Sequence, residues 1–302
     1  MEHASTNIKV AIASGKGGTG KTFISTNLFA TLEQSGFVPV IVDCDAEVPN
    51  DHLFFKGTGQ CIHTTKNLCP DLDSTACTFC RSCVEFCSYN AIVCIPSVHY
   101  IKLMDDLCHG CGACLHACKE GAIQEHFKVT GEVTAYSRHD DSHPFLYEAK
   151  LKEGEHSPVP VIKDAIKIAG TNPYDFMILD APPGCSCPFV TTVSEADYVL
   201  LVTEPTPFGL SDLKHTVTVL RTVGKPFSVV INRSDLGNGE MKNWLTKEGI
   251  DVLLEFQYSE EIASIYASGD LVVNKSDNLI EQFKLLKDKL LHKIKIYYNI
   301  NI

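Results

Sequence analysis

Short apolar runs are separated by longer amphipathic stretches along most of this chain. Runs suited to buried strands, with polar residues at their carboxyl ends, lie at residues 8–13, 38–45, 175–180, 200–207 and 227–233. Continuous apolar runs, in place of strict alternation, are typical of parallel strands that helices cover on both faces. The pattern therefore predicts an α/β fold with a doubly wound, mostly parallel sheet.

The pattern changes between residues 62 and 130, where cysteines are frequent and long apolar runs are missing. We expect this segment to be a separate small α+β domain inserted into the larger fold. Residues 1–61 and 131–302 then form one domain and residues 62–130 the other. Two domains suit a chain of 302 residues, because single domains commonly hold roughly 100–200 residues.

The last amphipathic stretch carries one apolar face, with lysines over much of the remainder. At helical spacing this face consists of Leu279, Phe283, Leu286, Leu290 and Ile294. Such a helix can pack on the sheet, or it can be a basic amphipathic helix that binds a membrane surface. We expect it to pack on the sheet.

A glycine-rich loop follows the first predicted strand, and residues 23–34 after it are expected to form a helix. The order strand, Gly-x-x-x-x-Gly-Lys-Thr, helix is that of a P-loop, which binds nucleotide phosphates through backbone N–H groups. A glycine-rich turn without a ligand is the alternative. The residues predicted to bind ATP here are Gly15, Lys16, Gly17, Gly18, Thr19, Gly20, Lys21 and Thr22.

Carboxylates stand at the carboxyl ends of two predicted strands. Asp43 and Asp45 end the second run, and Asp180 ends the run that begins at residue 175. In a doubly wound sheet these ends face the ligand crevice. We therefore predict a Mg²⁺ site made by Thr22, Asp43 and Asp180, with Asp43 acting indirectly. Lys21 is expected to neutralise phosphate charge.

The inserted segment holds a repeated cysteine pattern, Cys-x-x-Cys-x-x-Cys-x-x-x-Cys, which is the bacterial two-cluster ferredoxin run. In that arrangement the fourth cysteine of each run ligates the other cluster. The first predicted 4Fe–4S cluster has the ligands Cys77, Cys80, Cys83 and Cys118. The second has the ligands Cys108, Cys111, Cys114 and Cys87.

Two zinc sites are the alternative, although zinc ligands usually come as two separated Cys-x-x-Cys pairs. The remaining cysteines of the first half, Cys44, Cys61, Cys69 and Cys94, belong to no such framework. We expect them to be small buried or incidental residues.

Charge and cysteine content narrow the possible partners. A net charge of −11 argues against a nucleic-acid surface, which needs clustered Lys and Arg. No apolar run approaches the roughly 20 residues of a membrane helix, and residues 1–7 do not have the composition of a signal peptide. We therefore expect a cytoplasmic protein without a membrane span. Its 14 cysteines then favour metal or redox chemistry over disulfides.

Taken together, these motifs resemble the deviant P-loop ATPases of the MinD superfamily, which includes MinD, ParA, the nitrogenase iron protein and the Mrp-type cluster carriers. The match includes an additional lysine, Lys16, after the first loop glycine. The resemblance implies that Lys16 reaches across a dimer interface to the partner's nucleotide, although a solvated loop lysine is the alternative. It also implies that Asp180 acts through Mg²⁺, that Asp45 orients the attacking water, and that Asn232 reads adenine.

Asn232 is equally suited to a turn at the end of a strand. The resemblance further implies a homodimer, or a heterodimer with a related ATPase, and a redox or cluster-accepting partner protein.

A cysteine pair, Cys185 and Cys187, follows Asp180 closely. In the nitrogenase iron protein, a cysteine at the offset of Cys187 ligates a cluster shared by two subunits. The resemblance therefore implies an interface cluster at this pair, with chance occurrence as the alternative.

Three functions compete at this stage. The first couples ATP to assembly or transfer of a metallocluster, with the inserted domain supplying electrons. The second is an ATP-gated electron carrier, and the third is a MinD-like positioning ATPase with a structural ferredoxin domain. The complete cluster motifs favour the first two.

Overall fold

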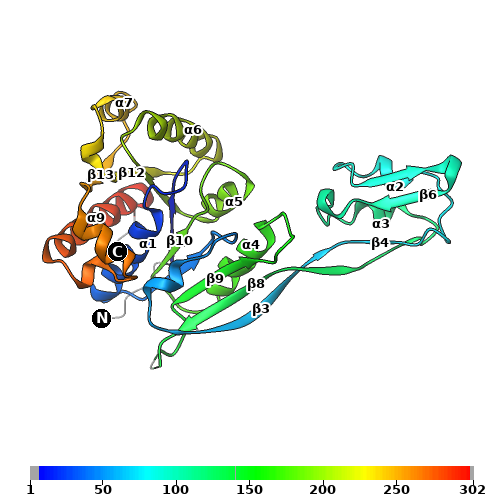
Figure 1. Cartoon of the computed structure of the whole chain (residues 1–302), viewed down its shortest axis with the longest axis horizontal. Helices are drawn as coiled ribbons and strands as arrows, with labels where there is room; N and C mark the ends of the chain where they lie inside the picture. The colour runs from blue at the N-terminus through cyan, green and yellow to red at the C-terminus, as the bar shows by residue number, and fades with distance from the viewer. Residues whose placement is uncertain (1–6, 140, 300–302) are drawn as a thin grey trace.

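The computed structural model describes residues 7–139 and 141–299 and places them in a broad body from which a smaller lobe projects (Figure 1). In the described residues, the body's sheet has nine strands in the order β13-β12-β11-β1-β10-β2-β9-β8-β3. They are β1 (Ile8–Ala13), β2 (Pro39–Asp43), β3 (Thr58–Leu68), β8 (Phe127–Ser137), β9 (Leu146–Leu151), β10 (Phe176–Asp180), β11 (Tyr198–Thr203), β12 (Phe227–Ile231) and β13 (Val252–Glu255). The strands from β13 to β9 run parallel, and β8 and β3 continue the sheet antiparallel.

Helices cover both faces of this sheet. One face packs on α4 (Val159–Ala169), α5 (Cys187–Glu195), α6 (Pro207–Val223) and α7 (Glu240–Lys247). The other packs on α1 (Lys21–Gln34), α8 (Glu260–Ala267) and α9 (Asp277–Tyr298). Successive residues of β1 enter opposite cores: Val10 and Ile12 lie in one, Ala11 and Ala13 in the other. The predicted doubly wound, mostly parallel sheet is confirmed.

The C-terminal helix packs as the sequence predicts. In α9 the buried side chains are the five of the predicted apolar face, and Phe283 meets the rings of Phe23 and Phe256. In the described part of the chain, no helix is long and apolar enough to cross a membrane.

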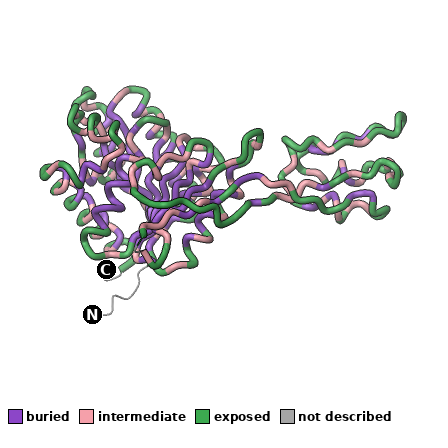
Figure 2. Tube along the Cα trace, turned by 60° about the horizontal axis from the view of Figure 1, so that its bottom comes forward, coloured by how far each residue is buried: buried purple, intermediate pink, exposed green. Residues whose placement is uncertain are grey.

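A two-stranded ribbon, formed by β3 and β8, connects the body to the lobe (Figure 1). Both strands run across the predicted domain boundaries at residues 61 and 131, so the compact part of the insertion is residues 69–126. Figure 2 shows buried residues concentrated in the body, whereas in the ribbon β3 is mostly exposed and β8 is mostly buried or half-buried. Asp164 of α4 holds the ribbon by accepting a hydrogen bond of 2.7 Å from the Thr65 hydroxyl.

The lobe, which we call the cysteine-rich module (residues 69–126), consists of two halves with the same order of loop, helix and strand. Its elements are β4 (Asp71–Leu72), α2 (Ser82–Glu85), β5 (Ile92–Ile95), β6 (Tyr100–Leu103), α3 (Ala113–Ala117) and β7 (Ile123–Gln124). Equivalent positions lie 31 residues apart, as in the cysteine repeat: α2 begins at Ser82 and α3 at Ala113. The strand pairing repeats as well, because Ile92 pairs with Leu103 and Ile123 with Leu72.

The backbone conformation repeats with the same spacing. Positive φ angles occur at Phe79 (56°) and Arg81 (70°), and again at Gly110 (64°) and Gly112 (74°). Non-glycine residues adopt this left-handed conformation rarely. Its occurrence at equivalent places in both halves shows that the two cysteine runs fold into the same loop. The module is therefore a pseudo-two-fold structure.

Candidate functional site

The glycine-rich loop lies between the end of β1 and the start of α1. Gly18 (φ 76°) and Gly20 (φ 97°) are left-handed, which glycine adopts without a Cβ penalty. No side chain caps the first turn of α1, so its orphan N–H groups and the helix dipole are left for an anion. This arrangement fits a nucleotide phosphate.

Lys21, Thr22, Asp45 and Asp180 meet at this loop. Thr22 Oγ1 donates a hydrogen bond of 2.8 Å to Asp180 Oδ2, while the buried Asp180 Oδ1 has no hydrogen-bond partner among the described residues. Burial raises the pKa of Asp180 and of Asp45, and the charge of Lys21 opposes both shifts. The hydroxyl and the orphaned carboxylate oxygen are donors that suit Mg²⁺.

Asp43 stabilises the loop that follows β2. Its carboxylate accepts hydrogen bonds from the backbone N–H groups of Asp45 (3.0 Å), Asn50 (2.8 Å) and Asp51 (3.0 Å). Asp43 is the register partner of Asp180 on the neighbouring strand. Since both Asp43 oxygens are already engaged, the geometry favours an indirect part for Asp43 in the predicted magnesium site.

Asp51 is a buried acid that the sequence analysis did not single out. Its side chain is fully buried, and neither carboxylate oxygen meets a hydrogen-bond donor within the described residues. Burial and repulsion from Asp43 and Asp180 raise its pKa well above the ordinary value. Asp51 is the first residue of the short 3-10 helix Asp51–Phe54. A single acidic residue at such a place does not indicate in the sequence that its side chain is buried.

Asn232, the expected adenine reader, braces the phosphate loop from the end of β12. Its Nδ2 donates a hydrogen bond of 2.9 Å to the carbonyl of Thr19, and its Oδ1 accepts one of 3.0 Å from the Arg233 backbone. A Cβ at Gly20 would lie 2.4 Å from Asn232 Nδ2. Glycine is therefore needed at position 20 for this close approach as well as for its positive φ.

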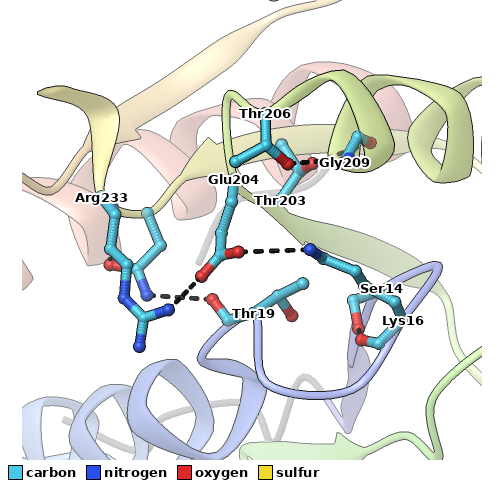
Figure 3. A network of polar contacts seen from close by, with 9 residues as sticks. Ser14, Lys16, Thr19, Thr203, Glu204, Thr206, Gly209 and Arg233 are labelled. Atoms are coloured by element: carbon cyan, nitrogen blue, oxygen red, sulfur yellow. Dashed lines mark hydrogen bonds and ion pairs between the residues drawn. The ribbon is translucent and has the colours of Figure 1, made fainter. Parts of the chain in front are cut away.

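Lys16 is held within its own chain by Glu204, which follows β11 (Figure 3). Lys16 Nζ lies 3.4 Å from Glu204 Oε2, and Arg233 Nη1 lies 2.5 Å from Glu204 Oε1. The Glu204 side chain is 8% exposed, whereas those of Lys16 and Arg233 are 32% and 43% exposed. A largely buried carboxylate thus lies between the side chains of the loop lysine and an arginine beside Asn232.

The position of Glu204 is fixed by the start of α6. Thr206 caps that helix by accepting a hydrogen bond of 3.0 Å from Gly209 N–H. A Cβ at Gly209 would lie 2.1 Å from the Glu204 carbonyl oxygen, so no larger residue fits there without moving the backbone. No local sequence pattern marks Glu204 or Arg233, because their contacts with Lys16 and with each other join residues far apart in the chain.

The cysteine pair lies beside the phosphate loop. Gly184 N–H donates a hydrogen bond of 3.1 Å to the Ser14 carbonyl, and Cys185 Sγ lies 3.4 Å from Thr216 Oγ1. Cys187 is exposed at the first residue of α5. The cysteine pair is therefore linked to the phosphate loop by a single hydrogen bond, between the residue before Cys185 and the residue before the loop.

The predicted ligands of the first cluster come together in the module. They line one cavity that is partly open to solvent. The lining cysteines are Cys77, Cys80, Cys83 and Cys118, together with Cys94. The spacing alone predicted that Cys118, from the second run, would join three cysteines of the first, and the fold brings it there.

Backbone N–H groups donate hydrogen bonds to one sulfur of each predicted ligand set. Phe79 N–H lies 3.3 Å from Cys77 Sγ and donates to it, and Ala91 N–H does the same to Cys87 Sγ at 3.3 Å. Of the second predicted ligand set, Cys114 is buried next to Cys83, whereas Cys111 is exposed. Cys108 lines a separate hollow that also contains Cys69.

Thiolates are ligands of zinc ions and of iron–sulfur clusters alike. Within residues 7–139 and 141–299, no three His, Cys, Asp or Glu side chains lie close enough to hold one metal ion.

The fold and the phosphate loop define the class of the protein, a P-loop ATPase built on a doubly wound sheet. A comparison with family models identifies the family: residues 10–272 match the CobQ/CobB/MinD/ParA nucleotide binding domain. The chain belongs to this family and is an ATPase of the MinD/ParA type.

Its relatives include two uncharacterized proteins of Methanocaldococcus jannaschii. One, MJ0579, is 27% identical over 90% of this chain and 95% of its own length. The iron-sulfur cluster carrier protein of Pyrococcus furiosus is 23% identical over 95% of this chain and 86% of its own length. The cell division ATPase MinD of the same organism shares the fold, with a TM-score of 0.54 and 18% identity. The match covers 95% of this chain and 99% of the MinD chain.

Proposed function

We propose that this chain is an ATP-driven iron–sulfur protein that couples its nucleotide state to metallocluster assembly or transfer. The observation that carries the proposal is the shared cavity of Cys77, Cys80, Cys83 and Cys118 in a chain that also holds a complete phosphate loop. Relatives named as iron-sulfur cluster carriers support the same class of function.

In this proposal the cysteine-rich module is a two-cluster ferredoxin. The repeat of loops, helices and strand pairs supports it, because each cysteine run occupies the equivalent place in its half of the module. When bound, the clusters supply one-electron chemistry. The chain's own part is to hold eight thiolates and direct backbone N–H groups toward their sulfurs, which tunes the potential.

At the nucleotide site, the side chains of the body do the remaining work. Lys21 neutralises charge on the phosphates, Thr22 and Asp180 hold Mg²⁺, and Asp45 orients the attacking water. Lys16 leaves Glu204 to contact the nucleotide of a partner subunit in a homodimer or in a heterodimer with a related ATPase. Hydrolysis then returns the chain to the state in which Lys16 pairs with Glu204.

The cysteine pair is the proposed place where ATP acts on a cluster. Four thiolates, two from each subunit, would hold a transferable cluster between the subunits. The hydrogen bond from Gly184 to Ser14 and the contact of Cys185 with Thr216 support this proposal, because both join the pair to the phosphate loop or its neighbour. A redox or cluster-accepting protein would be the recipient.

An ATP-gated electron carrier is the second candidate. The observation that favours it is the module's position at the end of the ribbon, away from the body (Figure 1), where it can meet an acceptor. A positioning ATPase with a structural ferredoxin domain would leave the thiolates without a chemical use.

Anaerobic transfer assays distinguish these functions. The reconstituted protein is incubated with a cluster-free acceptor enzyme, with and without Mg-ATP, and acceptor activity and iron are measured. The proposal predicts ATP-dependent transfer that Cys187→Ala abolishes and Cys61→Ala, a change at an exposed thiol on the ribbon, does not. ATP-dependent reduction of an acceptor without iron transfer would favour the electron carrier. If neither iron transfer nor acceptor reduction depends on ATP, the proposal is overturned.

A further inference from the structure

Cys94 is a fifth thiol in the cavity that the four predicted ligands of the first cluster share. The sequence places it outside both cysteine runs, on β5. Residues of that strand alternate between buried and exposed, and Ile92 and Cys94 occupy the buried positions. Cys94 is 9% exposed, so its thiol faces the interior of the module and not the solvent.

Of the five cysteines that line the cavity, Cys83 and Cys94 are the two that are buried. Cys83 belongs to the small core of the module with Ile92, whose neighbour on the same face is Cys94. Two buried sulfurs therefore lie at the same side of the cavity.

The other half of the module has no thiol at the equivalent place. The repeat puts Glu125 where Cys94 would recur, and that residue is exposed. Cys69 is the additional thiol nearer the second ligand set, but it lies in the hollow shared with Cys108, Lys128 and Glu155.

We propose that Cys94 is a reserve ligand of the first cluster, able to replace Cys83 on one iron. The proposal rests on the proposed function, since it requires a cluster in this cavity. In the exchange, the Cys94 thiol loses its proton and forms the new Fe–S bond. The Cys83 thiolate leaves its iron and takes up a proton. No electron is gained or lost.

This exchange would make two otherwise equivalent clusters chemically different. The first cluster keeps four thiolate ligands when Cys83 dissociates, whereas the second loses a ligand when Cys114 does. A cluster with a reserve ligand can change the coordination of one iron without losing it. The first cluster would thus be the more durable of the two under conditions that attack ligands.

The test is iron and acid-labile sulfide content of the full chain after anaerobic purification, with an EPR spectrum of the reduced protein. The wild type and Cys94→Ser are expected to hold about eight irons, as two four-iron clusters require. Cys83→Ser should also keep about eight, with an EPR spectrum altered for one cluster. Cys83→Ser/Cys94→Ser should fall to about four.

The pseudo-symmetric variant Cys114→Ser is the matched control, because it removes the equivalent ligand in the half where Glu125 stands in the place of Cys94. It should fall to about four irons. A value of about four for Cys83→Ser alone, or about eight for the double variant, overturns the inference. A Cys83→Ser chain that does not fold while Cys114→Ser does also overturns it, since a reserve ligand would let the module assemble. Absence of iron from the wild type would instead contradict the proposed function.

Discussion

Replacing Glu204 with glutamine tests whether this carboxylate holds Lys16 within its own chain. Glutamine has nearly the same shape and can still accept a hydrogen bond from Arg233 through its oxygen. Its amide nitrogen cannot attract the Lys16 ammonium, so the contact of 3.4 Å between Lys16 and residue 204 should open. Lys16 and Arg233 are both partly exposed, so water solvates them and no buried cation is left.

The magnitude follows from the geometry of the pair. Exposed ion pairs contribute about 0.2–1 kcal/mol, and hydrogen bonds to charged groups about 1.5–3 kcal/mol. Lys16 is about one-third exposed and its distance exceeds that of a short charge-assisted bond, so we expect about 1 kcal/mol. This corresponds to about a fivefold change in the ratio of held to released Lys16. If Lys16 must leave Glu204 before the dimer forms, the variant should form the dimer at a lower nucleotide concentration.

The assay is sedimentation of the dimer against the concentration of a non-hydrolysable ATP analogue. Glu204→Gln should lower the midpoint about fivefold, and Lys16→Ala should prevent the dimer from forming. Glu195→Gln is the matched control, because it removes the same charge from a surface pair with Lys9 at 3.8 Å. An unchanged or higher midpoint for Glu204→Gln would refute the reasoning.

Further predictions concern the nucleotide site and the cysteine pair. Lys21→Ala should abolish ATP binding, whereas Asp45→Asn should keep binding and reduce turnover at least about a hundredfold; equal loss of binding in both, measured with a fluorescent nucleotide, would contradict these roles. Asp51→Asn should stabilise the nucleotide-free chain by about 1–3 kcal/mol at neutral pH, because the amide can donate to nearby carboxylates. Since the pKa of Asp51 is raised in the folded state, the gain should grow as pH rises above 3.8, the ordinary value, and thermal unfolding at several pH values checks the sign. The double change Cys185→Ala/Cys187→Ala should remove only the iron in excess of eight per chain and leave ATP binding intact; no excess iron in the reconstituted dimer would show that the pair is incidental.

The parts of the molecule that local patterns encode could be predicted from the sequence. The buried strands, the phosphate loop and the apolar face of α9 each follow from residues close together in the chain, and all three are confirmed in the fold. The joining of Cys118 to the first cysteine run was also predictable, because the spacing is specific to one arrangement.

The parts that depend on distant contacts could not be predicted. Glu204 meets Lys16 only because β1 and β11 are neighbours in the sheet. The ribbon of β3 and β8 could not be predicted because β3 is exposed along most of its length. An exposed strand does not need alternating apolar and polar residues, so the sequence of β3 does not indicate a strand. Cys94 lies outside both runs, and only the folded module brings it to their cavity.

The most direct test of the central claim is an iron and acid-labile sulfide count with EPR on anaerobically purified protein, before and after addition of Mg-ATP. We expect about eight irons in the module of each chain, with a reduced spectrum from two 4Fe–4S clusters that changes when nucleotide binds. Zinc in place of iron after iron-replete expression would contradict the cluster assignment. A spectrum and iron content that Mg-ATP leaves unchanged, in protein that binds the nucleotide, would contradict the coupling.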